Sequence, residues 1–349
     1  MAAFHPLDVL LLYYLFDRHV HANRRNAVYL LSVLAMKQFL LNILKFIPLV
    51  IVFYVLMVVF WGEVMPDRYR KNLLYNRASF GHTLSRLTDA SQKKDVDILF
   101  LGASTCYRGF DTRYFESKGF SSFNLGSSSQ TPINTHQLLK RYLEHLNPKL
   151  VVYEVYPETF QIDGVESTLD ITANDHVDVY SAQMVFKTLN AKTLNTYIYA
   201  SYRQLTGKNH LFRQPKRRET DTYIDRNGFV ERDLTYFKYL TYEKEMVKGK
   251  VKKKEWIIRP NQQAAFEETI ALFKSKKIPY ILVRAPITSR LNDSYENNAE
   301  FDSYIQQQGR YYNFNKRLQL NDSLDFYDAV HLNRNGVKVF NKALYEQLK

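Results

Sequence analysis

Ser104 is the first residue whose setting in the sequence suggests chemistry. It stands in the stretch DILFLGASTCYRGFD, residues 97–111, directly after an apolar run that predicts a strand covered on both faces. Gly102 and Ala103 leave room for close backbone approach, and a helix beginning at the serine would offer amide donors to an oxyanion. The stretch fits a nucleophile at a strand end, and it also fits an ordinary serine in a turn.

Asp328 and His331 could supply the partners that a serine nucleophile needs. A serine hydroxyl needs a base, and the base needs a group that orients it. The two residues are three positions apart, so that the carboxylate can hold the imidazole in one tautomer. The alternative is a surface or core histidine in a loop before the last helix, with Asn333 as the cap of that helix.

From residue 96 onward, short apolar runs alternate with helical patterns, which is typical of an α/β fold with a parallel sheet. The predicted strands are 96–103, 120–126, 149–157, 279–286 and 311–315, and the predicted helices include 131–146, 261–276, 297–308 and an amphipathic C-terminal helix. Ligands bind beyond the carboxyl ends of such strands. We therefore expect Ser104, Gly126 and Glu154, at the ends of the first three strands, to face one crevice.

Three motifs resemble conserved blocks of the SGNH (GDSL-like) hydrolase superfamily: FLGAS ending the first strand, NLGSSS ending the second, and YDAVHLNRNG before the last helix. The last motif is similar to the form found in membrane-anchored relatives, the teichoic-acid D-alanine transfer proteins and the alginate O-acetylation proteins. The resemblance covers about 96–157 and 279–349. It implies a three-layer α/β/α fold with a five-stranded parallel sheet in the order 2-1-3-4-5.

The resemblance also implies roles for single residues. Ser104 would be the nucleophile, His331 the general base and Asp328 its orienting partner, and the amides of Ser104 and Gly126 would bind the oxyanion. The family's asparagine after the third strand is missing, because Glu154 and the residues after it stand in its place. Free-standing esterase activity is therefore in doubt.

Other polar residues of these loops are candidates for the remaining roles. Gln130 or Ser128 could replace the missing oxyanion donor, or serve only as loop structure. Glu154 could bind an amine or hydroxyl of a substrate, although a carboxylate aimed at an oxyanion would oppose the chemistry. Cys106 is expected in the following helix, facing the core.

An apolar stretch, residues 39–61, is long enough to cross a bilayer. We predict an anchor at 36–62, preceded by an extension of unclear status at 1–35 and followed by a linker with a helix at 63–95. A cleaved signal peptide is the alternative, but no small-x-small cleavage site follows. We expect the C-terminal domain, 96–349, outside the cytoplasm.

Residues 160–260 interrupt the alternation and are predicted to be an insertion that covers the site. It carries two basic runs, 213–218 and 248–259, in a chain whose net charge is +13. Beside a membrane anchor, such runs favour anionic head groups or an anionic envelope polymer over nucleic acid. One cluster (Asp170, Asp175, His176 and Asp178) could bind a hard metal ion, or could be a polar lid loop.

No zinc-protease, paired CxxC, Walker or GxGxxG motif occurs, and we expect no cofactor and no metal. Two hypotheses follow. The first is a membrane-anchored serine acyl hydrolase or O-acyltransferase acting on an ester of an envelope glycan or polymer, with an integral membrane O-acyltransferase as a possible partner. The second is a non-catalytic anchored scaffold with the same fold that binds an anionic polymer or a membrane partner.

Overall fold

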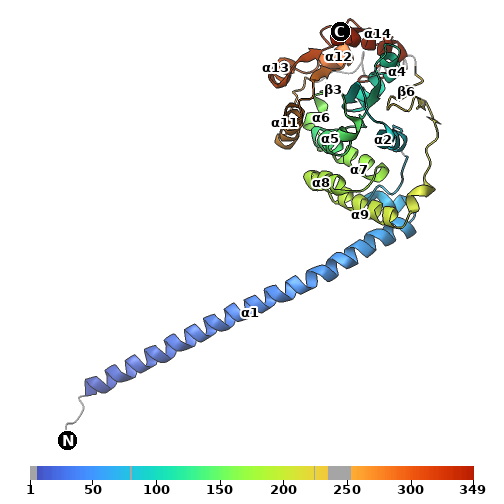
Figure 1. The fold of residues 1–349 in the computed structure, drawn as a ribbon. Coiled ribbons are helices and arrows are strands. Elements are labelled where there is room, and N and C mark those ends of the chain that lie inside the picture. Colours follow the sequence, from blue (N-terminus) through green and yellow to red (C-terminus); the bar gives the residue numbers. More distant parts are fainter. Residues whose placement is uncertain (1–5, 79–80, 224, 235–252) are drawn as a thin grey trace. The chain divides into compact units, whose positions relative to one another are not determined.

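The computed structural model describes residues 6–78, 81–223, 225–234 and 253–349 (Figure 1). The chain forms two compact units, Met1–Trp61 and Gly62–Lys349. The boundary lies at the end of the apolar stretch, and the segment 63–95 belongs to the second unit, where it forms η1 (Asp67–Asn72) and α2 (Thr83–Gln92).

The first unit consists of one long helix, α1 (Pro6–Val64), which continues without interruption from the N-terminal extension into the apolar segment. Its part Ala35–Val64 has a mean hydropathy of 2.7 over its most apolar window. Thirty helical residues span about 45 Å at 1.5 Å per residue, against a hydrocarbon core of about 30 Å. This helix is therefore long and apolar enough to cross a membrane.

The second unit contains a sheet of five strands, all of them parallel. In spatial order these are β2 (Ser122–Asn124), β1 (Ile98–Leu101), β3 (Leu150–Glu154), β7 (Tyr280–Arg284) and β8 (Tyr311–Asn313). They are the five strands expected from the apolar runs, and counted along the chain they lie in the order 2-1-3-4-5. The predicted α/β fold class and strand order are confirmed.

Helices cover both faces of the sheet, which explains why its strands are apolar on both sides (Figure 1). Ile98 and Phe100 point toward α3 (Ser104–Gly109), α4 (Thr112–Glu116) and α14 (Arg334–Leu348). The alternate residues Leu99 and Leu101 point toward the opposite face, where α2, α5 (Pro132–Leu146), α11 (Pro260–Ser275) and α13 (Asn298–Gln308) pack. The result is a three-layer α/β/α domain.

The segment between β3 and α11 forms two different structures. Its first part is helical and comprises α6 (Glu158–Gln161), α7 (Val165–Asn174), α8 (Val179–Thr188), α9 (Ala191–Leu205) and η2 (Lys208–Leu211). In this part α7 packs on α2 and α8 packs on α5, while α9 packs on α7 and α8. Its second part is an antiparallel sheet of β4 (Arg217–Arg218), β5 (Asp221–Thr222) and β6 (Glu231–Arg232). Part of the second basic run, 248–252, lies outside the described residues.

Phe340 is the side chain through which α14 is tied to the rest of its layer. It is fully buried, with its ring edge-on to Phe110 at 5.0 Å and to Phe314 at 5.1 Å. Truncation of Phe340 would leave a cavity between the two remaining rings, those of Phe110 and Phe314. We expect Phe340→Ala to lower the free energy of unfolding by about 3–5 kcal/mol in urea titrations of the detergent-solubilised chain. The neighbouring Val339→Ala, at a position 39% exposed, is the control and should change it by less than about 1 kcal/mol. Equal losses in the two variants would contradict this account of α14.

Candidate active site

Ser104 lies at the junction where β1 ends and α3 begins, as the strand–turn–helix pattern predicts. The chain turns at Gly102, whose φ of +149° is a conformation that side-chain-bearing residues rarely adopt. A Cβ at this glycine would lie 2.5 Å from Glu154 Oε2, so the turn also needs the space. Ser104 therefore projects from a fixed turn at the carboxyl end of the central part of the sheet.

The loop that carries Asp328 and His331 is built around the aspartate. Asp328 Oδ1 accepts hydrogen bonds from the backbone amides of Val330 (2.9 Å) and His331 (2.7 Å), which closes a tight turn. The Thr288 hydroxyl and amide, after β7, donate to the carbonyl of Ala329. Asn333 then caps α14 by accepting from the amides of Asn335 and Gly336. The loop is thus fixed by the turn at Asp328, by the contact of Ala329 with Thr288 and by the cap at Asn333.

Ser104, His331 and Asp328 converge, although 227 positions separate the serine from the histidine. His331 Nε2 lies 2.8 Å from Ser104 Oγ, and His331 Nδ1 lies 2.8 Å from Asp328 Oδ2. With the proton on Nδ1, the imidazole donates to the carboxylate and accepts from the serine hydroxyl. The His331 side chain is 19% exposed, so that a substrate can reach it from solvent.

The charge of Asp328 suits an orienting role. Partial burial alone would raise the pKa of this carboxyl, but hydrogen bonds from the His331 ring and from two backbone amides lower it below its ordinary value. The carboxylate therefore stays ionised and can stabilise an imidazolium when His331 takes up a proton.

Glu154 does not face the crevice. Residues 152 and 154 share a face of β3, and that face is covered by α3, so the carboxyl is buried beneath the Ser104 turn. Its Oε2 accepts from the amide of Ala103 at 3.3 Å, and its Oε1 has no partner among the described residues. The expected role in binding a substrate amine or hydroxyl is not available to a side chain in this position.

The oxyanion donors expected from the sequence are only partly in place. The amide of Gly126 is engaged, because it donates to Asn124 Oδ1 at 3.1 Å. The Gln130 side chain is buried and bonded to Ser127 and Thr135, and the Ser128 hydroxyl pairs with Tyr107. Gln130 and Ser128 therefore act as loop structure here. The Ser104 amide remains, since it opens α3 and has no intrahelical acceptor.

Two groups near the triad were missed from sequence. Asn124, at the end of β2, donates to the carbonyls of Cys106 and Phe110 and so fastens α3 to the sheet. Tyr327 stacks on His331, with the rings 5.5 Å apart and inclined by 4°, and Arg232 lies over the Tyr327 ring at 4.9 Å. Tyr327 could have been proposed from the sequence, because it directly precedes Asp328. Arg232 lies in the insertion, where no sequence pattern connects it with the site.

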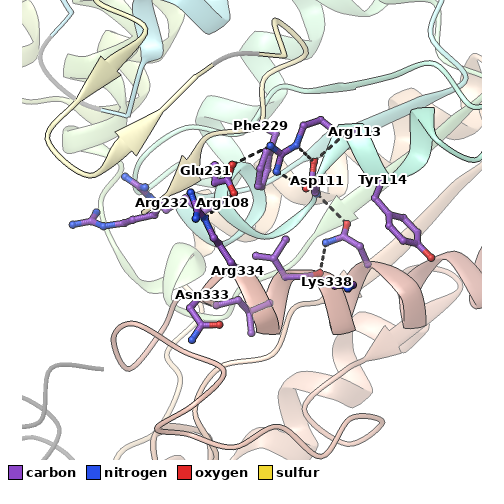
Figure 2. Close-up of a pocket in the computed structure, with 13 residues that line it drawn as sticks. Arg108, Asp111, Arg113, Tyr114, Phe229, Glu231, Arg232, Asn333, Arg334 and Lys338 are labelled. Carbon is purple, nitrogen blue, oxygen red and sulfur yellow. Dashed lines mark hydrogen bonds and ion pairs between the residues drawn. The ribbon is translucent and has the colours of Figure 1, made fainter. Parts of the chain in front are cut away.

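A pocket of about 200 Å³ lies beside the triad (Figure 2). Arg108, one turn beyond Ser104 on α3, and Asn333, two residues beyond His331, both line it, whereas Ser104 and His331 do not. Figure 2 shows that most of its charged groups are paired, as in the contact of Arg113 with Asp111 and Glu231. The pocket carries more cationic than anionic side chains, beside apolar groups such as Phe229 and Leu332.

The acidic cluster considered as a metal site serves the packing of α7 and α8. Asp175 and Asp178 both pair with Arg141 of α5, and Asp178 also caps α8. Asp170 accepts from the hydroxyl of Thr83 at 2.6 Å. Within the described ranges, no group of three His, Cys, Asp or Glu side chains is arranged to hold a metal ion. Cys106 is buried in α3 as expected, and burial raises the pKa of its thiol well above the ordinary value.

Comparison with known proteins gives a likeness in fold at low identity. No family model matches the chain, and no curated protein matches it. Two solved structures align with 78% of it at 13% identity: a protein assigned as an acylhydrolase from Bacteroides fragilis, over 99% of its chain with a TM-score of 0.35, and a GDSL-like lipase from Bacteroides thetaiotaomicron, over 100% of its chain with a TM-score of 0.36. Likeness at this level assigns neither substrate nor mechanism to this chain.

The position of Glu154 predicts a pH dependence of stability. Burial raises the pKa of this carboxyl to about 8. The amide of Ala103, the Thr105 hydroxyl and the charge of Arg284 act in the opposite direction, but burial is the larger effect. Between its ordinary value of 4.5 and about 8, the folded chain holds a proton that the unfolded chain has lost. Stability contributed by this proton is therefore lost as pH rises through this window.

We expect Glu154→Gln, which cannot ionise, to reduce the fall in unfolding free energy between pH 5 and 8 by a few kcal/mol, at about 1.4 kcal/mol per pKa unit. Urea titrations at a series of pH values measure it. Glu144→Gln, at a side chain 85% exposed, should keep the wild-type slope. A slope that is the same in all three proteins would mean that Glu154 is already ionised in the folded chain.

Proposed function

We propose that the protein performs acyl-ester chemistry through Ser104, as a hydrolase or as an O-acyltransferase. The observation that carries the proposal is the continuous chain of hydrogen bonds from Ser104 Oγ through the His331 ring to Asp328, with 2.8 Å at each junction. A serine at a strand end, a base within hydrogen-bond reach and a carboxylate that fixes the base together form a nucleophile-activating arrangement.

The proposed reaction follows from this geometry. Ser104 Oγ attacks the ester carbonyl while His331 Nε2 takes its proton, and the negative charge that develops on the carbonyl oxygen is met by the Ser104 amide. His331 then returns the proton to the leaving alkoxide as the acyl–serine ester forms. Water or an acceptor hydroxyl, deprotonated by the same imidazole, attacks the acyl group and restores the serine. Asp328 holds the tautomer throughout.

The substrate class we propose is an ester of an envelope glycan or polymer. The helix Ala35–Val64 supports anchoring at a membrane, and the net charge of +13 favours an anionic acceptor. The expected orientation puts the domain Gly62–Lys349 outside the cytoplasm, where such polymers lie. The acyl donor would then come from an integral membrane O-acyltransferase, in keeping with the membrane-anchored proteins that the sequence motifs resemble.

One observation favours a second candidate, the non-catalytic scaffold. Because Gly126 donates to Asn124 and no asparagine follows β3, the Ser104 amide is the one expected donor that remains available in the described part of the chain. Removal of a single oxyanion donor costs an enzyme about 10²–10³ in rate. A chain short of such donors could bind an acylated polymer without turning it over.

Covalent labelling separates the two candidates. We expect a serine-directed fluorophosphonate to add one adduct to the solubilised chain, detected by intact mass, and we expect Ser104→Ala and His331→Ala to abolish it. Ser117→Ala, at an exposed serine after α4, should label at the wild-type rate. Absence of an adduct on the folded wild type, with an integral membrane O-acyltransferase present as well as without it, would refute the enzyme and leave the scaffold.

Asp328→Asn tests the orienting role without removing the loop, because an amide oxygen can still accept from the amides of Val330 and His331. The amide nitrogen would favour the wrong imidazole tautomer, so we expect the labelling rate to fall by about 10³–10⁴. The circular dichroism spectrum and the melting temperature should stay close to those of the wild type. An unchanged labelling rate would mean that Asp328 only shapes the turn.

A further inference from the structure

One stretch of the second unit is unusually poor in acidic residues. From 179 to 218, which includes α8, α9 and η2, the sequence contains eight Lys and Arg residues and no Asp or Glu. The whole chain has 35 acidic residues in 349, so about four would be expected in a stretch of 40. The excess of basic over acidic residues is therefore concentrated in this stretch of the sequence, in which Lys187, Lys208 and Arg217 pair with acids from outside it.

The same stretch carries a large share of the exposed apolar side chains. Among the described residues after Val64, ten large hydrophobic side chains are exposed, and five of them lie here: Val179, Phe186, Leu189, Leu205 and Leu211. Leu205 is 88% exposed and Leu211 is 66% exposed, on either side of a single turn. Bulky aliphatic groups next to cations are typical of protein surfaces that contact a membrane interface.

Hydrogen bonds place this turn close to the point where the chain leaves the apolar helix. Glu63, one residue before the end of α1, accepts from the Tyr199 hydroxyl at 3.0 Å and from Lys208 Nζ at 2.6 Å. Further along, the amide of Leu74 donates to Thr196 Oγ1 at 2.8 Å. Glu63 directly follows the anchor predicted at 36–62, so insertion of that anchor would bring Lys208 and the turn around it near the bilayer surface.

We propose that the turn at 205–216, called here the η2 face, docks on an anionic lipid surface. Leu205 and Leu211 would enter the interface between head groups and acyl chains, while the exposed Arg213 and Lys216 contact lipid phosphates. The proposal rests on the membrane anchoring proposed above and not on the serine chemistry. Its consequence is a domain held against the bilayer by a second contact besides its anchor.

A pocket supports the choice of an anionic lipid. It has a volume of about 590 Å³, and its lining includes Arg77, Arg213, Lys216 and Arg226 with a single carboxylate, Asp89. Arg226 is paired with that carboxylate, so the other three cations face no acidic lining residue of their own. The pocket follows η2 directly, since Phe212 and Gln214 also line it. A lipid phosphate group is the anion that a membrane contact would bring to this place.

Site-directed fluorescence on the full chain in vesicles tests the proposal. Cys106 is buried, so an environment-sensitive thiol dye will mark an introduced cysteine selectively. Leu205→Cys and Leu211→Cys report on the η2 face, and Leu324→Cys, at a residue 63% exposed in the loop before Asp328, is the matched control. In vesicles that contain phosphatidylglycerol, we expect a blue shift, quenching by brominated lipid and loss of iodide quenching at 205 and 211, with none of these at 324.

Charge variants and flotation distinguish the possible failures. Combining Arg213→Glu with Lys216→Glu should restore iodide quenching at 205, whereas Lys338→Glu with Lys342→Glu, on α14, should not. If the chain floats with the vesicles but the dyes at 205 and 211 stay as exposed to water as the dye at 324, the docking proposal is wrong. Membrane anchoring would then still stand. Protection seen only in native membranes would overturn it in favour of a protein partner. A chain that does not float would overturn the anchoring as well, while fluorophosphonate labelling would still report on Ser104.

Discussion

The position of Ser104 depends on how closely the backbone approaches itself at the carboxyl ends of β1 and β2. A Cβ at Gly126 would lie 3.0 Å from the carbonyl oxygen of Gly102 and 3.1 Å from that of Ala103, and a Cβ at Gly102 would collide with Glu154. Gly102 therefore requires glycine both for space and for its φ of +149°, and a side chain at Gly126 would force its neighbours to shift by a few tenths of an ångström. The turn at Gly102 and Ala103 thus lies in close contact with Gly126, after β2, and with Glu154, at the end of β3. These contacts fix the position of Ser104 relative to the sheet.

The site also requires that the loop with Asp328 and His331, near the C-terminus, lies beside the turn that carries Ser104. The helix α14 provides the connection, because Asn341 donates to the carbonyl of Gly109 and accepts from the amide of Asp111, at the two ends of the α3–α4 junction. Phe340 packs on Phe110 at the same junction. The helix that bears the serine at its start and the helix that follows the histidine are thus joined directly, which keeps Nε2 and Oγ within hydrogen-bond distance.

Sequence patterns predicted the parts of the molecule that depend on local or strongly periodic features. The strands could be predicted because both of their faces are apolar, and Ser104, Asp328 and His331 because a strand end and a three-residue spacing constrain where side chains point. The direction of Glu154 follows from the alternation along β3, but we expected this residue to face the crevice because it stands at the end of its strand. The orientation of the Gly126 amide and the stack of Arg232 on Tyr327 depend on tertiary contacts, which no local pattern reports.

The proposed site combines a serine in contact with its base with a shortage of oxyanion donors, and these two features have different expected consequences for rate. The serine–histidine contact governs attack, whereas each donor stabilises charge that exists only in the transition state. Under the proposed mechanism, a site with a single such donor is expected to turn over esters slowly.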